Sequence, residues 1–376
     1  MPPQALRADA VRVAASARNV DRVVFDEYDI RAWYASPYPL DNGEERKHTD
    51  TPCNLWVCAG CFKYMQTARA LYTHRRTCTH CRPPGRKVYQ RGAHIIWEVD
   101  GAAETLYTQN LCLFGKLFID HKTIFFDVDP FLCYVLTDAT SQFDHVLGFF
   151  SKEKLSYDDY NLACIVVFPP YQRRGYGTLL MEYSYVASQR AGVAGTPERP
   201  LSELGLKGYI SFWTATLLRA LQRAFIGTGP GADAVRAVLA GEAACAPRST
   251  LSRRPPLRTQ RGWAGELGEK GALPDAADAP VVPMPSQTTL ARIAAAAGLR
   301  VEDATLALAH AGLLERMDAE AERPVCESTH DGVEPRGGMG AAPSREPTLV
   351  LEQKAVDAAA ARFALKPAIL DPVYLL

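Results

Sequence analysis

The sequence predicts an α+β protein, in which antiparallel strands lead into a strand, a glycine-containing loop and a helix. Short apolar segments typical of strands recur between residues 94 and 168. The segment 160–191 then joins an apolar run, a Gln-Arg-Arg-Gly-Tyr-Gly loop and an amphipathic helical pattern. Nearer the start, cysteine and histidine residues follow one another at the spacing of metal ligands. These patterns predict a metal-binding lobe, followed by a domain that binds a ligand at the open end of its sheet.

Charge is balanced over the chain as a whole but not near its start. The 376 residues, enough for two or three domains, include 42 basic and 42 acidic side chains, so the net charge indicates no partner. Residues 51–97 nevertheless lack Asp and Glu. Their eight basic residues are Lys63, Arg69, Arg75, Arg76, Arg82, Arg86, Lys87 and Arg91. Such a segment suits contact with nucleic acid or an acidic protein, and a solvated basic loop would have the same composition.

The sequence carries no signal for secretion or membrane insertion. Its first residues lack the charged start and apolar core of a signal peptide. No apolar stretch approaches the ~20 residues that a membrane-spanning helix needs. We therefore expect a soluble intracellular protein without membrane contact, whose ten cysteines are reduced thiols or metal ligands.

Cys58, Cys61, His74 and Cys78 have the Cx2Cx12Hx3C spacing of a zinc site. Residues 67–77 have helical spacing, which would place His74 and Cys78 one turn apart on the same face. A rival site would use Cys81 in place of His74, but Cys81 precedes a Pro-Pro-Gly sequence where the helix must have ended. Free cysteines and a surface histidine are the remaining alternative. One finger favours a structural or docking role, because DNA-reading fingers normally occur in tandem.

Between the zinc motif and residue 160 the pattern is mostly typical of strands. Residues 94–99 and 104–107 flank Asp100-Gly101, which predicts a hairpin. Residues 111–118 predict a short buried helix. Further strands are expected over residues 123–128, 131–136 and 146–150.

The segment 160–191 predicts a strand, an anion-binding loop and a helix. The apolar run 162–168 ends at Pro169-Pro170, because proline cannot continue a strand ladder. The loop places Gly175 and Gly177 at the start of the helix expected over residues 178–191. Backbone N–H groups and the helix dipole at such a loop can bind a phosphate, although a plain basic turn would look similar. Neither the GxGxxG dinucleotide loop nor a P-loop ending is present.

The last third of the chain alternates segments without periodicity and segments with helical patterns. Residues 227–286 are rich in Pro, Gly, Ala and Arg, which predicts disorder. From Thr288 onward, two helical patterns separated by Gly298 predict a helix-turn-helix unit. DNA reading by this unit is not expected, because residues 288–318 carry three Arg against four acidic residues. A second loose segment covers residues 319–347.

Several motifs occur together in the order found in MYST-family histone acetyltransferases. They are residues 27–30 (Glu-Tyr-Asp-Ile), 33–39 (Trp-Tyr-Ala-Ser-Pro-Tyr-Pro), the Cx2Cx12Hx3C motif, residues 107–113, 120–123 and 148–154, the loop 172–177, and residues 197–205 (Pro-Glu-Arg-Pro-Leu-Ser-Glu-Leu-Gly). The loop also resembles the pyrophosphate loop of the Gcn5-related acetyltransferase superfamily. This resemblance covers residues 18–224 almost without gaps.

The resemblance implies an acetyl-coenzyme A-binding domain and assigns its reacting residues. Glu198 corresponds to the general base that removes a proton from the substrate lysine. Cys164 corresponds to a cysteine for which a transient acetyl-cysteine has been argued, although a cysteine in an apolar strand is commonly a core residue. We rank direct attack of the lysine on acetyl-coenzyme A above the covalent route. Lys122 matches a lysine that becomes autoacetylated, whereas its sequence context alone predicts a surface lysine.

The resemblance also implies which residues contact the two bound groups, acetyl-coenzyme A and a structural zinc ion. The matching positions are Ile165, Val166 and Val167 for the acetyl group and pantetheine arm, Arg173, Arg174, Gly175, Tyr176, Gly177 and Thr178 for the pyrophosphate, and Ser202 and Ser211 for further polar contacts. The zinc ligands are those of the Cx2Cx12Hx3C motif.

Composition and resemblance together divide the chain into five segments. They are a disordered N-terminus (1–17), a zinc-finger lobe (18–95), an acetyl-coenzyme A-binding core (96–224), a disordered insert (225–286) and a helix-turn-helix or winged-helix-like C-terminal lobe (287–376) with the loose insert 319–347. No chromodomain-like barrel or reader finger is expected before Val20.

The implied function is acetylation of lysine side chains in histone tails, in the nucleus, as part of chromatin and transcription regulation. Histone tails or nucleosomes and the subunits of a multiprotein complex are the expected partners. The basic residues between 63 and 91 would add at most weak DNA contact. The alternative is a weakly active or non-catalytic scaffold that binds coenzyme A and zinc.

Overall fold

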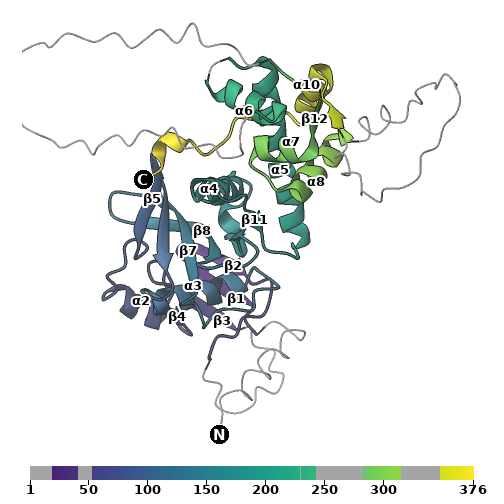
Figure 1. The fold of residues 1–376 in the computed structure, drawn as a ribbon. Coiled ribbons are helices and arrows are strands. Elements are labelled where there is room, and N and C mark those ends of the chain that lie inside the picture. Colours follow the sequence, from purple (N-terminus) through teal and green to yellow (C-terminus); the bar gives the residue numbers. More distant parts are fainter. Residues whose placement is uncertain (1–18, 41–52, 229, 243–282, 286, 315–347) are drawn as a thin grey trace, which may run out of the picture. The chain divides into compact units, whose positions relative to one another are not determined.

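The computed structural model describes residues 19–40, 53–228, 230–242, 283–285, 287–314 and 348–376. The chain divides into two units. Unit 1 comprises Met1–Ser188, Gly195–Tyr209 and Ala368–Leu376, and unit 2 comprises Gln189–Ala194 and Ile210–Pro367. Figure 1 traces the elements of both units in sequence order. The segments predicted to be disordered or loose at 1–17 and 319–347, and most of 225–286, lie outside the described residues.

Unit 1 begins with a small sheet of order β2-β1-β3-β4. Its elements are β1 (Arg22–Phe25), β2 (Tyr28–Arg31), β3 (Asn54–Val57), β4 (Tyr64–Met65) and the following helix α2 (Ala68–Arg75). The Thr67 side chain accepts the N–H of Ala70 and so caps the start of α2. The helix ends at Arg75, so the prediction that Cys78 lies on it is wrong.

A five-stranded antiparallel sheet of order β10-β8-β7-β6-β5 forms the centre of unit 1. Its strands are β5 (Arg86–Arg91), β6 (His94–Asp100), β7 (Phe131–Ala139), β8 (Asp144–Glu153) and β10 (Cys164–Val167). The strands predicted over 94–99, 131–136 and 146–150 are therefore confirmed. The boundary predicted between residues 95 and 96 falls inside β6, because β5 and β6 belong to this larger sheet.

The apolar run 162–168 forms parts of two strands instead of one. β9 (Tyr160–Leu162) pairs in parallel with β11 (Thr196–Pro197), whereas β10 pairs with β8. Ala163 lies between them and donates its N–H to the carbonyl of Ser151 at 2.7 Å. The chain thus changes partner strand at Ala163, a step that a continuous apolar run does not reveal.

Two predicted strands between β6 and β7 are wrong. Helix α3 (Thr105–Lys116) occupies the positions expected to form the second hairpin strand. Tyr107, Leu111 and Phe114 are buried at helical spacing, so the apolar pattern belonged to one longer helix. The predicted strand 123–128 has no regular structure, and Ile124 and Phe126 are 41% and 46% exposed.

The predicted loop and helix after β10 are present. A short 3-10 turn, η2 (Pro169–Tyr171), follows the strand, and helix α4 (Tyr176–Arg190) follows the loop. The helix begins two residues before the expected start and ends ahead of Gly192, whose φ of 78° is the left-handed conformation common after helices.

An aromatic cluster joins the small sheet to the central sheet within unit 1. Phe25 and Phe62 come from the small sheet and its turn, Phe114 from α3, and Phe168 from the end of β10. Their ring centroids lie 4.7 Å (Phe25–Phe114), 5.5 Å (Phe62–Phe114) and 4.8 Å (Phe114–Phe168) apart. Each ring is 1% exposed or less. The four rings belong to one cluster of buried residues, so the two sheets share one hydrophobic core. Truncating one of these side chains to alanine should cost about 3–5 kcal/mol.

Unit 2 is mainly helical among its described residues. Its elements are α5 (Glu203–Ile226), which starts in unit 1, α6 (Pro230–Ala240), β12 (Gln287–Thr289), α7 (Leu290–Ala297), α8 (Val301–Ala311), β13 (Thr348–Val350) and α10 (Gln353–Arg362). Gly298 ends α7 in the left-handed conformation, as predicted. Helix α6 falls within the segment 225–286, so the prediction of disorder is wrong for these residues. Ala232 and Leu239 are its buried apolar residues.

The final residues, Ala368–Leu376, return to unit 1. They include the 3-10 turn η4 (Pro372–Tyr374) and end beside β5, where Leu375 forms a bridge with Tyr89 (Figure 1). Within the described part of the chain, none of the helices is both long enough and apolar enough to span a bilayer.

Candidate functional site

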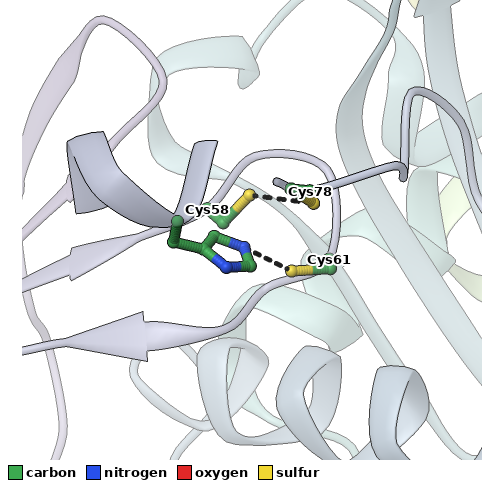
Figure 2. A group of neighbouring side chains, drawn as sticks. Cys58, Cys61 and Cys78 are labelled. Carbon is green, nitrogen blue, oxygen red and sulfur yellow. Dashed lines mark hydrogen bonds between the residues drawn. The ribbon is translucent and has the colours of Figure 1, made fainter. Parts of the chain in front are cut away.

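Four metal-ligating side chains converge between β3, β4 and α2. Cys58 and Cys61 lie on a turn in which the Phe62 N–H donates to the Cys58 carbonyl at 2.9 Å. His74 lies in the last turn of α2, and the Cys78 N–H donates to its carbonyl at 2.9 Å, which brings Cys78 back toward the turn. Figure 2 shows the three cysteine side chains directed toward one centre.

The four donor atoms fit one tetrahedral zinc ion. The Sγ atoms of Cys58 and Cys78 are 3.8 Å apart, and Cys61 Sγ lies 3.2 Å from His74 Nε2. All four donor atoms lie within 4.8 Å of one another. Three thiolates and one imidazole are one of the usual ligand sets of structural zinc. Cys81 is exposed and outside this group, so the predicted set with His74 is confirmed.

The loop before α4 presents backbone N–H groups at a helix N-terminus. Arg173 and Gly175 have φ values of 62° and 87°, and this left-handed geometry turns the chain sharply into α4. Gln172 stabilises the turn, because its side-chain amide donates to the Val167 carbonyl at 2.8 Å. The first intrahelical hydrogen bond runs from the Leu179 N–H to the Gly175 carbonyl at 3.0 Å. The N–H groups before Leu179 therefore have no acceptor within the helix. Such amides, aided by the helix dipole, suit a pyrophosphate.

The start of α4 is also held from the central sheet. The hydroxyl of Tyr176 lies 3.3 Å from His94 Nε2, and the two rings are 5.3 Å apart. Tyr176 is the first residue of α4 and His94 the first residue of β6. The loop is therefore fixed to two elements of unit 1.

Ile165, Val166 and Val167 lie on β10, which is an edge strand of the central sheet. β10 approaches β8 closely at Gly148, where a Cβ atom would lie 2.4 Å from the Val166 carbonyl oxygen. An edge strand pairs with a neighbour on one side only. Its other side can pair with an extended amide-containing ligand, such as a pantetheine arm.

Glu198 follows β11 and is tied to β9. Its N–H donates to the Leu162 carbonyl at 2.8 Å, two residues before Cys164. The pKa of the Glu198 carboxyl is raised by partial desolvation and by the negative charge of Glu153, while the positive charge of Lys122 opposes the shift. A carboxylate with a raised pKa is a stronger base, which suits proton removal from an amine.

Cys164 belongs to a row of small polar side chains across three strands. It pairs with Ser151 of β8, and Ser151 pairs with Cys133 of β7. Partners in adjacent strands project from the same face of a sheet, so the three side chains are neighbours. Burial raises the pKa of the Cys164 thiol, with Lys122 opposing and Glu198 adding to the shift. The thiol therefore stays protonated near neutral pH.

Lys122 is only 5% exposed, in contrast to the surface lysine that its sequence context predicts. It lies near Cys112 of α3, whose pKa is lowered by a hydrogen bond from Cys133 and by the charge of Lys122, against the effect of burial. Sequence patterns did not single out Cys112, Cys133, Ser151 or Glu153. Their proximity depends on strand register and on the packing of α3, which single residues in apolar runs do not disclose.

The two predicted serine contacts have different surroundings. Ser202 precedes α5 and its Oγ accepts the Gly205 N–H at 3.1 Å, which caps the helix. Ser211 lies on α5 in unit 2. Contact of either serine with a cofactor stays a prediction.

Two family models match consecutive parts of the chain. The MYST family zinc finger domain matches residues 17–78, which include all four zinc ligands. The MOZ/SAS family matches residues 82–230, which include β5 to β11, the loop before α4 and Glu198.

Curated relatives are similar over the same region. The chain is 46% identical over 203 residues to "Histone acetyltransferase MOF" of Drosophila melanogaster, 43% over 216 residues to "Histone acetyltransferase Tip60 homolog" of Caenorhabditis elegans, and 43% over 199 residues to "Histone acetyltransferase KAT6A" of Homo sapiens. These matches cover 54%, 57% and 53% of this chain and 24%, 45% and 10% of the relatives, so the chain spans less than half of their length. With a MYST family zinc finger followed by a MOZ/SAS family domain, the chain belongs to the MYST family of histone acetyltransferases.

Proposed function

We propose that this chain transfers the acetyl group of acetyl-coenzyme A to lysine side chains of histone tails. The observation that carries the proposal is the hydrogen bond from Glu198 to Leu162, which keeps a base of raised pKa beside the edge strand that starts at Cys164. Family membership and the printed names of the relatives, all histone acetyltransferases, support the substrate class.

The proposed cofactor position follows β10 into α4. The amides of Arg173, Arg174, Gly175, Tyr176, Gly177 and Thr178 would receive the pyrophosphate. The edge formed by Ile165, Val166 and Val167, where the Val167 carbonyl already accepts the Gln172 amide, would pair with the pantetheine arm. Ser202 and Ser211 are proposed as further polar contacts. Acetyl-coenzyme A supplies an acetyl thioester at the β10 end of this path.

In the proposed reaction Glu198 prepares the nucleophile. A lysine ammonium has a pKa near 10.4 in water and cannot attack a carbonyl until it loses a proton. Glu198 takes that proton, directly or through a water molecule, and the neutral amine attacks the thioester carbonyl. As the carbon–sulfur bond breaks, the attached nitrogen loses its second proton to solvent, and the coenzyme leaves as a thiolate that takes up the proton held by Glu198.

We propose that Cys164 lines this site and does not act as a nucleophile. Its raised pKa keeps little thiolate at neutral pH, which disfavours a covalent acetyl-cysteine step. Replacing Cys164 by alanine should therefore leave most of the activity. Lys122 is proposed as the autoacetylated lysine, and its burial beside Cys112 implies that acetylation would change charge inside the site.

We extend the proposal to the surroundings of the enzyme. Family membership supports a nuclear location, partner subunits and a winged-helix-like lobe built on α7 and α8. For DNA contact we propose Arg69, Arg75 and Arg76, which are exposed and lie on or directly after α2. Arg82 and Lys87 instead stack over Trp97 at 5.9 and 5.2 Å.

The proposed function is tested by incubating the full chain with acetyl-coenzyme A and core histones and following acetyl-lysine by mass spectrometry. Glu198→Gln should lower kcat at pH 7.5 by about 10²–10⁴-fold, because a neutral amide cannot accept the proton. Glu203→Gln, an exposed change nearby in sequence, is the matched control and should keep wild-type turnover. Equal turnover in wild type and Glu198→Gln would show that Glu198 is not the general base. Coenzyme A binding without any transfer would favour a non-catalytic scaffold.

A further inference from the structure

The last residues of the chain close over α4 through a buried carboxylate. One oxygen of Glu182, Oε2, accepts the N–H groups of Ile369 and Leu370 at 2.9 and 2.7 Å. Glu182 is 6% exposed and Leu370 5% exposed, so these bonds lie in the interior of unit 1. Two charge-assisted bonds from backbone amides offset the desolvation of the carboxylate. We call residues Ala368–Leu376 the C-terminal segment.

A second set of contacts holds the C-terminal segment on β5. Arg91 Nη1 donates to the Ile369 carbonyl at 3.0 Å, and the Arg91 guanidinium lies 5.8 Å from the ring of Tyr374. The Leu376 N–H donates to the Val88 carbonyl at 3.0 Å. The segment is therefore fixed on α4 at one end and on the outer strand β5 at the other.

The backbone of Ile369 takes part in both sets of contacts, and its side chain contacts the loop before α4. Its Cδ1 atom lies 3.0 Å from the place where a Cβ at Gly175 would stand. Gly175 has a φ of 87° and no side chain, so its backbone has more conformational freedom than any other residue type would have. Ile369 occupies the space into which this turn would otherwise relax.

We propose that Glu182 is a positioning residue for the loop that receives the coenzyme A pyrophosphate. By holding the C-terminal segment, Glu182 keeps Ile369 against Gly175 and so fixes the direction of the amides at the start of α4. Glu182 lies on the second turn of α4 and acts only through Ile369, without contact to the cofactor. The inference rests on the function proposed above, and its energetic basis is that a site held in its binding geometry loses less entropy on binding.

The test compares Ile369→Ala, Glu182→Ala and Glu182→Gln in the full chain. Ile369 is 39% exposed, so its truncation should leave the fold intact, and the amide oxygen introduced by Glu182→Gln can still accept both N–H groups. By calorimetry the Kd for coenzyme A should rise about fivefold to tenfold in Ile369→Ala and Glu182→Ala and clearly less in Glu182→Gln. Val373→Ala, a change at a 78% exposed residue of the same segment, is the matched control.

A second readout separates loop positioning from general damage. S-acetylpantetheine carries the same thioester but no pyrophosphate, so its use as acetyl donor should change by less than about twofold in Ile369→Ala. With acetyl-coenzyme A the KM should rise while kcat at saturation stays near wild type. Thermal melting of every variant identifies any loss of fold. If Glu182→Ala is unfolded, the coenzyme A affinity of Ile369→Ala alone tests the proposal.

Two results would overturn the positioning role. One is wild-type coenzyme A affinity in folded Ile369→Ala, and the other is an equal loss with both donors. A wild-type chain that does not bind coenzyme A would instead contradict the proposed function, so the two failures are distinguishable.

Discussion

Two side chains of opposite charge act on the Glu198 carboxyl, and together with burial they set the pH at which it can act as a base. Glu153 and partial desolvation favour the protonated carboxyl, whereas Lys122 favours the carboxylate. The net shift of the pKa is upward. Activity that needs the carboxylate should therefore fall as the pH drops through this raised pKa, at a higher pH than for an ordinary glutamate.

The sign of each contribution can be tested by removing one charge at a time. Glu153→Gln removes a negative neighbour, so the pKa of Glu198 should fall and the acidic limb of the profile of kcat/KM against pH should move down by up to about one unit. Lys122→Met removes the positive neighbour and should move the same limb upward relative to wild-type enzyme that is not acetylated at Lys122. Profiles recorded for both variants and for Glu203→Gln, which should match wild type, check the prediction. Shifts of the same sign in both variants would contradict it.

At the scale of single residues, the sequence predicts a site where its residues lie close together along the chain. The zinc ligands follow from their separations along the chain, because one turn, helix α2 and the residues directly after that helix bring them together. Glu153 and Cys133 were not predicted as neighbours of the site. Their positions depend on the register of β7, β8 and β10, and a shift of one residue would turn these side chains to the opposite face.

Among the elements, the metal-binding turn contributes a side chain to the hydrophobic core of unit 1 as well as ligands to the zinc site. Phe62, the residue after Cys61, has a φ of 57° and lies in the aromatic cluster with Phe25 and Phe114. A left-handed conformation is unfavourable for phenylalanine, so the surrounding contacts must impose it. Zinc bound by the turn would supply such a constraint.

Removal of zinc should therefore destabilise the shared core and not only the finger. We expect one zinc per chain in wild type, and its extraction with a chelator should lower the free energy of unfolding by more than about 4 kcal/mol. Metal analysis and urea unfolding followed by tryptophan fluorescence measure both effects.

His74→Ala and Cys81→Ser are the paired variants for this prediction. His74→Ala should weaken zinc binding and stability together, whereas Cys81→Ser should change neither, because Cys81 is exposed and outside the ligand group. Full zinc occupancy and stability in His74→Ala would show that another residue completes the site.

Elements with a single strong pattern were predicted, and those that depend on distant partners were not. β7, β8 and α4 occupy the residues that their apolar patterns indicate. α3 was predicted only in its second half, because Asp100-Gly101 resembles a hairpin turn although β6 pairs with β5 and β7 instead. The switch at Ala163 also requires knowledge of β8 and β11, which no local pattern provides.

At the scale of the whole molecule the two units do not follow the segments predicted from the sequence. The predicted core 96–224 contains parts of both units, because Gln189–Ala194 and the residues from Ile210 onward, within α5, belong to unit 2. Unit 1 in turn includes Ala368–Leu376, far from its other residues in sequence. Composition detects neither feature, since helix α5 is continuous and the C-terminal segment is short.

A chain truncated after Pro367 should lose stability in unit 1. Without the N–H groups of Ile369 and Leu370, the buried carboxylate of Glu182 loses these two hydrogen-bond donors, and loss of one partner of a buried charge costs about 3–5 kcal/mol. Urea unfolding of the truncated and full chains measures the difference. Glu182→Leu in the truncated chain should recover part of the loss, because no charge then needs a partner. Equal stability of truncated and full chains would contradict this role.

The C-terminal segment also has a consequence for the order of events during synthesis. Domains generally begin to fold as they leave the ribosome, N-terminal parts first. Arg91 and Ile369 are 278 residues apart, so β5 and α4 emerge long before the residues that cover them. A nascent chain can form the zinc-binding lobe and the central sheet, but the side of α4 around Glu182 stays uncovered until residue 370 has left the tunnel. The cofactor loop would then reach its final geometry, and bind the cofactor tightly, only after Ile369 and Leu370 have left the tunnel.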